Sequence, residues 1–255
     1  MSIWGKILGA SAGYALGGPL GALAGVVVGH YIGRFRAEAN AAEQLEQSIN
    51  TGPESRRSER QVSFAIAVIA LSAKLAKVDG VVSRDEVEKF KRVFHIATAE
   101  IKDVGAIFNE ARESAENFES YAQQVAVMFH PNLAVLEELI DALFAIAKAD
   151  GKLHQSELDY LRSVARIFGF GDTEFERISA GHAPDPSSEP YLILGVSQDI
   201  SDEDLKSHHR RLVLQHHPDR LIAEGMPAEF IDQANQKLAL VNSAFDQVRK
   251  MRARS

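Results

Sequence analysis

Residues 202–219 read DEDLKSHHRRLVLQHHPD, and this stretch decides the fold of the C-terminal part of the chain. It follows Ser201, a favoured N-cap, and opens with three acids in what would be the first helical turn. Apolar residues then recur on one side of the predicted helix and basic residues on the other. Pro218 lacks a backbone N–H and disfavours helical geometry at the preceding residue, so the helix must end there. We therefore expect His217 and Asp219 to lie on a loop.

Helical patterns flank this stretch on both sides. Residues 189–196 predict one or two helical turns that end at Gly195. After the loop, an apolar pattern of helical period begins near Pro227, a favoured first position, and continues to Met251. The sequence thus predicts two antiparallel helices with the His-Pro-Asp tripeptide at their tip.

Residues 189–255 resemble the J domain, the cochaperone module that acts on DnaK-type heat-shock chaperones. More narrowly, residues 219–227, 236–237 and 242–245 resemble the DjlA branch of that family. The resemblance implies that the tripeptide engages the chaperone and promotes its ATP hydrolysis, while a basic helix face meets an acidic chaperone surface. The implied chaperone-binding residues are His217, Pro218, Asp219, Lys206, Arg210 and Arg211. Without the tripeptide, the three cations would be interpreted as an ordinary solvated helix face.

One departure from the family pattern precedes the basic pair. The common Ala-Tyr is replaced by His208 and His209. The loss of the aromatic ring would weaken packing or make docking sensitive to pH, because histidine titrates near neutrality. No pair among His208, His209, His216 and His217 has the three- or four-residue spacing that places two metal ligands on one helical face, so we predict no metal site.

The start of the chain, residues 1–33, predicts a membrane segment. No residue from Ile7 to Ile32 carries a formal charge apart from His30, and roughly 20 apolar residues span a bilayer. Small residues recur at every fourth position, a pattern that forms a groove for close helix packing and predicts a homodimer. The groove residues are Gly9, Gly13, Gly17, Gly21, Gly25 and Gly29.

Two features bear on the topology of this segment. Residues 17–19, Gly-Gly-Pro, would kink one spanning helix or turn two short ones into a hairpin, and a single span is favoured. Lys6 precedes the segment, whereas Arg34 and Arg36 follow it. The excess of basic residues after the segment predicts that the C-terminal domains are cytoplasmic, at the inner membrane.

The middle of the chain contains an internal repeat. A polar linker, residues 34–59, precedes a helical domain over residues 60–179, and a second linker covers residues 180–188. Within the domain, the pattern Ala-Lys-x-Asp-Gly-x5-Glu occurs at residues 76–86 and again at 147–157. The spacing resembles part of a calcium-binding loop, but its first and third ligand positions hold Leu or Ile and Lys, which lack the required oxygens.

The repeat therefore indicates helix ends. We expect Gly80 and Gly151 to end helices and Ser83 with Glu86 to cap the next one. The paired pattern resembles the TerB-like helical domain of DjlA proteins. The expected fold class is all-α: a glycine-rich membrane segment, a TerB-like bundle of six to eight helices and a J-domain hairpin.

Composition narrows the function classes. A net charge of −7 argues against a generic nucleic-acid binder. The absence of cysteine excludes disulfides, thiol catalysis and cysteine-ligated zinc. The sequence contains neither a glycine-rich loop of the kind that binds phosphate nor a credible catalytic triad, so we expect no enzymatic activity and no cofactor. The leading interpretation is a membrane-anchored cochaperone of a DnaK-type chaperone, and the alternative is a membrane scaffold or envelope-stress sensor dominated by the middle domain.

Overall fold

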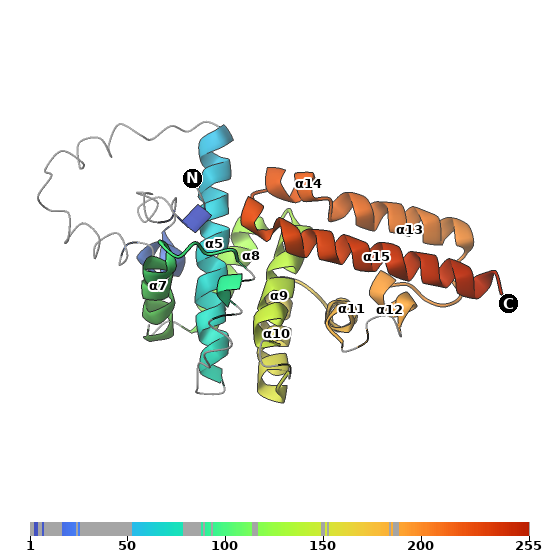
Figure 1. Ribbon diagram of the computed structural model, residues 1–255, viewed down its shortest axis with the longest axis horizontal. Helices are drawn as coiled ribbons and strands as arrows, with labels where there is room; N and C mark the ends of the chain where they lie inside the picture. Colours follow the sequence, from blue (N-terminus) through green and yellow to red (C-terminus); the bar gives the residue numbers. More distant parts are fainter. Residues whose placement is uncertain are drawn as a thin grey trace, which may run out of the picture.

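The computed structural model describes residues 3, 4, 7, 17–23, 25, 53–78, 88, 90–92, 94–113, 117–148, 151, 153–183, 185 and 189–254 of the chain. Within these ranges every regular element is a helix, which confirms the predicted all-α class. Figure 1 shows an upright helical bundle from which a long helical hairpin extends to one side.

A long apolar helix, α5 (Pro53–Val78), forms the centre of the bundle. It packs against α7 (Ile101–Glu113), α8 (Phe118–Phe129), α9 (Leu133–Ala147) and α10 (Gln155–Ile167). Among the described residues, one helical stretch, Arg56–Val78, is long and apolar enough to cross a bilayer, and 83% of its most apolar window is buried. That burial makes α5 the core helix of the bundle.

The two copies of the repeat lie at equivalent helix ends. In the first copy α5 ends at Val78, and in the second α9 ends at Ala147. Gly151 has a φ of +88°, a conformation that favours glycine, and Glu157 Oε2 accepts a hydrogen bond from the backbone N–H of His154 at 2.8 Å. The glutamate of the second copy thus caps α10. The expected cap at residues 83–86, together with Gly80, lies outside the described residues.

The C-terminal part contains the two long antiparallel helices that the sequence predicts, with a short helix and a 3-10 turn between them. It follows α11 (Asp172–Gly181) and comprises α12 (Pro190–Leu194), α13 (Asp202–Gln215), α14 (Pro218–Ala223), the 3-10 turn η2 (Ala228–Phe230) and α15 (Ile231–Arg252). Gly195 ends α12 in the left-handed conformation, with φ +65°. A small apolar core joins α12, α13 and α15. Its buried members are Ile193, Leu194, Leu205, Leu212, Val241, Ala244 and Val248.

The hairpin and the bundle share a second core at the base of the hairpin. Phe230 is 1% exposed, and its ring packs edge-on against Phe64 of α5 with centroids 4.8 Å apart. Leu221 and Met226 are buried in the same cluster. The turn after α14 also approaches α5 closely, because a Cβ on Gly225 would lie 2.6 Å from Cβ of Arg60. The hairpin is therefore packed onto the bundle over residues 221–234.

The described residues of the N-terminal segment contact this shared core. Trp4 is fully buried, its indole N–H donates to the Phe94 carbonyl at 2.9 Å, and its ring lies 6.3 Å from the rings of Phe94 and Phe230. Leu20 is also buried, and its backbone N–H donates to Gln124 Oε1 at 2.9 Å. The chain at Leu20 thus lies beside α8.

The backbone at Gly17 and Gly18 departs from helical geometry. Both residues have positive φ angles, +54° and +58°, which a right-handed helix does not contain. Because residues 8–16 lie outside the described residues, the choice between a kinked single span and a hairpin stays a prediction. Three of the groove residues, Gly9, Gly13 and Gly29, lie outside the described residues.

Candidate functional site: the corner between α13 and α14

The His-Pro-Asp tripeptide lies at the corner where α13 ends and α14 begins. Ser201 caps α13 by accepting from the backbone N–H of Asp204 at 3.0 Å, and the helix ends at Gln215 as expected from Pro218. His217 then caps α14, because its Nδ1 accepts from the backbone N–H of Asp219 at 3.2 Å.

The expected loop after the proline was wrong. Pro218 is the first residue of the short helix α14, where its missing N–H costs nothing, so Asp219 lies in the first turn of a helix. The side chains of His217 and Asp219 are 50% and 90% exposed. A partner protein can therefore reach both.

Two of the three predicted cations share one exposed face of α13, the helix that ends at this corner. At about 100° per residue, Lys206 and Arg210 fall within about 40° of one another around the helix axis. Neither cation is buried. Arg211 lies roughly 100° away from Arg210 on the same helix. It turns back along the helix, where its guanidinium donates to His208 Nδ1 at 2.7 Å.

The two histidines that replace Ala-Tyr have separate structural roles. His209 stacks on Phe245 of α15, with ring centroids 4.0 Å apart and planes 10° apart, and its Nε2 lies 2.9 Å from Asn242 Oδ1. The imidazole thus supplies an aromatic contact between the two long helices. His208 Nε2 donates to the Leu194 carbonyl at 2.8 Å. Burial, with the neighbouring Arg211 charge, lowers the pKa of His208, which favours its neutral form.

A buried ionic cluster lies directly beneath the corner, where the hairpin meets α9. Lys237 of α15 contacts three carboxylates of α9, those of Glu137, Glu138 and Asp141. Its Nζ lies 2.5 Å from Asp141 Oδ2. His216, which immediately precedes the tripeptide, places Nδ1 2.9 Å from Glu138 Oε1. Both helices of the hairpin are therefore tied to α9.

Two further residues, Arg177 of α11 and His182 directly after it, complete this cluster. Arg177 donates to Glu137 Oε2 at 2.6 Å, and His182 Nε2 lies 2.7 Å from Asp141 Oδ1. Burial alone would raise the pKa of Glu137, but the charges of Lys237 and Arg177 outweigh it and hold the pKa well below its usual range. The pKa of Asp141 is lowered in the same way, against its burial, by Lys237 and by the hydrogen bond from His182. Conversely, burial alone would lower the pKa of Lys237, but the carboxylates outweigh it and raise that pKa.

This cluster was not predicted from the sequence. A signal was present in α9, LAVLEELIDALFAIA, where three acids interrupt a helix that is otherwise apolar all round. A helix of that composition is buried, and buried carboxylates require cationic partners. The missing information was which cations meet them, since Lys237 lies 96 positions away from Asp141.

Family models match the chain in the order that the structure shows. Residues 1–44 match the model described as "Co-chaperone DjlA transmembrane domain", residues 65–180 match "Tellurite resistance protein TerB", and residues 189–255 match "DnaJ domain". The exposed tripeptide corner is thus part of a DnaJ domain. These matches define the class: a J-domain co-chaperone with a TerB-like domain and a transmembrane segment.

Whole-chain relatives narrow the class to a family. "Co-chaperone protein DjlA" of Photobacterium profundum is 30% identical over 97% of this chain and 98% of the relative. The protein of the same name from Vibrio cholerae serotype O1 is 28% identical over 98% of each chain, and that from Coxiella burnetii is 28% identical over 78% of this chain and 81% of the relative. The chain belongs to the DjlA co-chaperone family. No solved structure matches it.

Proposed function

We propose that the chain stimulates ATP hydrolysis by a DnaK-type chaperone through the corner between α13 and α14. The observation that carries this proposal is the exposed pair His217 and Asp219, which lies at the end of α13, the helix that carries the exposed cations Lys206 and Arg210. The six expected chaperone-binding residues are His217, Pro218, Asp219, Lys206, Arg210 and Arg211. The ATPase in this scheme is the chaperone, so we assign no catalytic step and no cofactor to the chain itself.

The rigidity of this corner supports the proposal. A surface that is already ordered loses less conformational entropy when a partner binds than a mobile loop does. Here His216 is anchored to α9 on one side of the corner, and Leu221 is buried in the shared core on the other. The tripeptide is therefore presented in one orientation.

A single-turnover ATPase assay tests the proposal. Full-length chain in nanodiscs is mixed with the DnaK-type chaperone of the same organism loaded with labelled ATP, and hydrolysis is followed with the wild type and with His217→Gln. We expect stimulation by the wild type and none by the variant. The control is Glu203→Gln, at the exposed far end of α13, which should stimulate fully. Equal stimulation by wild type and His217→Gln would leave the membrane scaffold or stress sensor as the better interpretation.

We also propose that the N-terminal segment anchors the chain in the inner membrane, with the C-terminal domains in the cytoplasm. The match to a transmembrane domain model and the basic residues Arg34 and Arg36 support this placement. Because the chain has no cysteine, a single cysteine at Ser255 can be labelled in intact cells with a membrane-impermeant maleimide. We expect labelling only after the membrane is opened. Labelling in intact cells would show that the C-terminal domains lie outside the cytoplasm and would contradict this orientation.

Trp4 offers a second measurement of the anchor, because it is the only tryptophan of the chain. Its fluorescence should be quenched by brominated lipid if the segment enters the bilayer, since such quenching requires contact with the acyl chains. Insertion would remove Trp4 from Phe94 and Phe230. If brominated lipid leaves the fluorescence unchanged, Trp4 stays in the shared core.

A homodimer through the glycine groove is the last element of the proposal. Its residues are Gly9, Gly13, Gly17, Gly21, Gly25 and Gly29. Gly25 is the best position for a test, because a Cβ added there meets no atom within 4 Å of its own chain. Gly25→Leu should therefore weaken crosslinking between copies by keeping the helices apart, without disturbing the fold. Undiminished crosslinking would discard this interface.

A further inference from the structure

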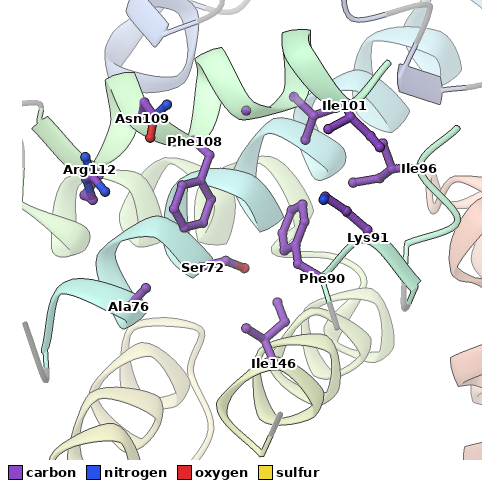
Figure 2. A pocket seen from close by; sticks show the side chains of 12 residues that line it. Ser72, Ala76, Phe90, Lys91, Ile96, Ile101, Phe108, Asn109, Arg112 and Ile146 are labelled. Carbon is purple, nitrogen blue, oxygen red and sulfur yellow. The ribbon is translucent and has the colours of Figure 1, made fainter. Parts of the chain in front are cut away.

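A cavity of about 380 Å³ lies in the TerB-like bundle, between α5, α7 and the residues that precede α7. Its lining is mostly apolar, and Figure 2 shows the rings of Phe90 and Phe108 at its centre with Ser72 between them. The volume falls at the lower end of the range for small-molecule sites, about 300–1,000 Å³. In Figure 1 this part of α7 lies at the opposite end of the molecule from α13.

The cavity is elongated along α7. The α7 residues that line it are Ile101, Val104, Gly105, Phe108, Asn109 and Arg112. These positions form one helical face and reach from Ile101 to Arg112, about 16 Å along the axis. A long, narrow and apolar space of this kind fits an unbranched aliphatic chain better than a helix of a partner protein.

Two features show that this space is not filled by the protein itself. A Cβ added to Gly105 would meet no atom within 4 Å, although glycine inside a helix costs about 1 kcal/mol relative to alanine. Ser72 is fully buried, and among the described residues its Oγ has no hydrogen-bond partner. A buried hydroxyl of that kind requires a partner that these residues do not supply.

The charged side chains that line the cavity, Lys91 and Arg112, are both cations at its rim. They are 26% and 38% exposed, and in Figure 2 they lie at its two ends. Each contacts an exposed glutamate, Glu88 or Glu113. Exposed pairs of this kind contribute little, so an incoming carboxylate can replace the glutamate.

We propose that this cavity is a binding site for a free fatty acid, whose aliphatic chain lies along α7 and whose carboxylate pairs with Lys91 or Arg112. The proposal is independent of the chaperone corner. It assigns to the TerB-like domain the capacity to bind a single-chain anionic amphiphile.

Photolabelling with a diazirine analogue of octanoate tests the site in the full-length chain. The chain is held in phosphatidylcholine nanodiscs, labelled, digested and mapped by mass spectrometry. We expect the label on α5 and α7 residues that line the cavity, and we expect excess octanoate to remove it. The nanodisc holds phospholipid in excess, so labelling here also shows that phospholipid chains do not occupy the site. A label confined to other helices overturns the proposal.

Filling variants give the steric test. Gly105→Leu places a side chain in the empty space and should lower labelling about tenfold or more. Gly105→Ala changes the helix backbone in the same way but adds little volume, and Lys102→Leu adds the same side chain on the exposed side of α7; both should label like the wild type. Unchanged helical content by circular dichroism in all three shows that they are folded. Labelling of Gly105→Leu at the wild-type level contradicts the site.

Charge variants test the head group. Lys91→Gln or Arg112→Gln should weaken competition by octanoate about threefold to fivefold, and the affected variant identifies the end that binds the carboxylate. Competition by the neutral 1-octanol should not change. If the variant that combines Lys91→Gln and Arg112→Gln binds octanoate as the wild type does, these cations do not hold the carboxylate, and the proposed head-group contact is wrong.

Discussion

His216 Nδ1 lies 2.9 Å from Glu138 Oε1, and the two side chains are 3% and 2% exposed. This contact joins the last residue before the tripeptide to the middle of the bundle. Lys237 reaches the same carboxylate from the return helix, at 3.7 Å. The TerB-like domain therefore holds the corner that carries the tripeptide from both sides.

We expect Glu138→Ala to lower the free energy of unfolding by about 3–5 kcal/mol, because it leaves buried groups without their partner. Chemical denaturation of the full-length chain, followed by circular dichroism, measures the change. Glu110→Ala, on the exposed side of α7, is the matched control and should stay within about 0.5 kcal/mol of the wild type. Similar values for the two variants would show that the contact beneath the corner contributes no more than a surface carboxylate.

The same cluster predicts loss of stability in acid. The pKa values of Glu137 and Asp141 are lowered in the folded state, from 4.5 and 3.8, so their contribution is fully present above those values and is lost as the pH falls through the lowered ones. Asp141→Asn should therefore be less stable than the wild type at pH 7, and the difference should shrink toward pH 3. Denaturation midpoints at pH 7, 5, 4 and 3 measure it.

The control for the acid experiment is Asp246→Asn, an aspartate of α15 that lies outside the cluster. Its difference from the wild type should be close to zero at every pH. The charged neighbours Lys237, Arg177, His182 and His216 are the same in both variants. A constant difference for Asp141→Asn between pH 7 and pH 3 would contradict the assigned pKa direction.

The sequence predicted what depends on local patterns. The cap at Ser201, the end of α13 before Pro218 and the left-handed Gly195 each follow from a few neighbouring residues, and the structure contains all three. The short helix Pro218–Ala223 was missed, because proline both ends one helix and favours the first turn of another. A local pattern alone does not decide between these two effects.

Contacts between distant segments were beyond a local pattern. Phe230 falls within the apolar pattern that begins near Pro227, but its partner Phe64 lies far earlier in the sequence, on α5. Lys237 likewise meets carboxylates of α9 that lie far earlier in the sequence. An apolar period indicates that a residue is buried, but it does not identify the residues that cover it. The packing of the hairpin on the bundle could therefore not be predicted from the sequence.

His209 provides a prediction about the departure from the family pattern. The sequence suggested that an aromatic contact is lost when histidine replaces the family's tyrosine, but His209 supplies such a contact by stacking on Phe245. His209→Tyr should therefore keep the stability of the hairpin. His209→Ala should lose about 0.5–1.5 kcal/mol, the contribution of an aromatic pair. Thermal unfolding measures both, with Ser207→Ala on the exposed face of α13 as the control. Equal stability of the Ala and Tyr variants would mean that the stack contributes nothing.

The orientation of the three cations predicts unequal effects on chaperone binding. Arg210→Glu reverses an exposed charge on the face of α13 that Arg210 shares with Lys206, whereas Arg211→Glu reverses one that is turned toward His208. We expect the first variant to weaken binding more than the second, and added salt to weaken wild-type binding. Titration calorimetry at two ionic strengths measures this. Equal losses, or affinity that does not depend on salt, would exclude the proposed docking face.

Phe230 tests whether the hairpin and the bundle unfold as one unit. Its ring contacts Phe64 of α5 and Phe94, with centroids 4.8 and 4.9 Å apart, so Phe230→Ala should lower the free energy of unfolding by about 3–5 kcal/mol. Hydrogen exchange should accelerate in α14 and η2, which contact the bundle, and much less in α12, which belongs to the separate small core. Met251→Ala, whose side chain is 51% exposed, should change neither. If exchange accelerates equally in α12 and α14, the small core depends on the shared one, and the hairpin has no stability of its own.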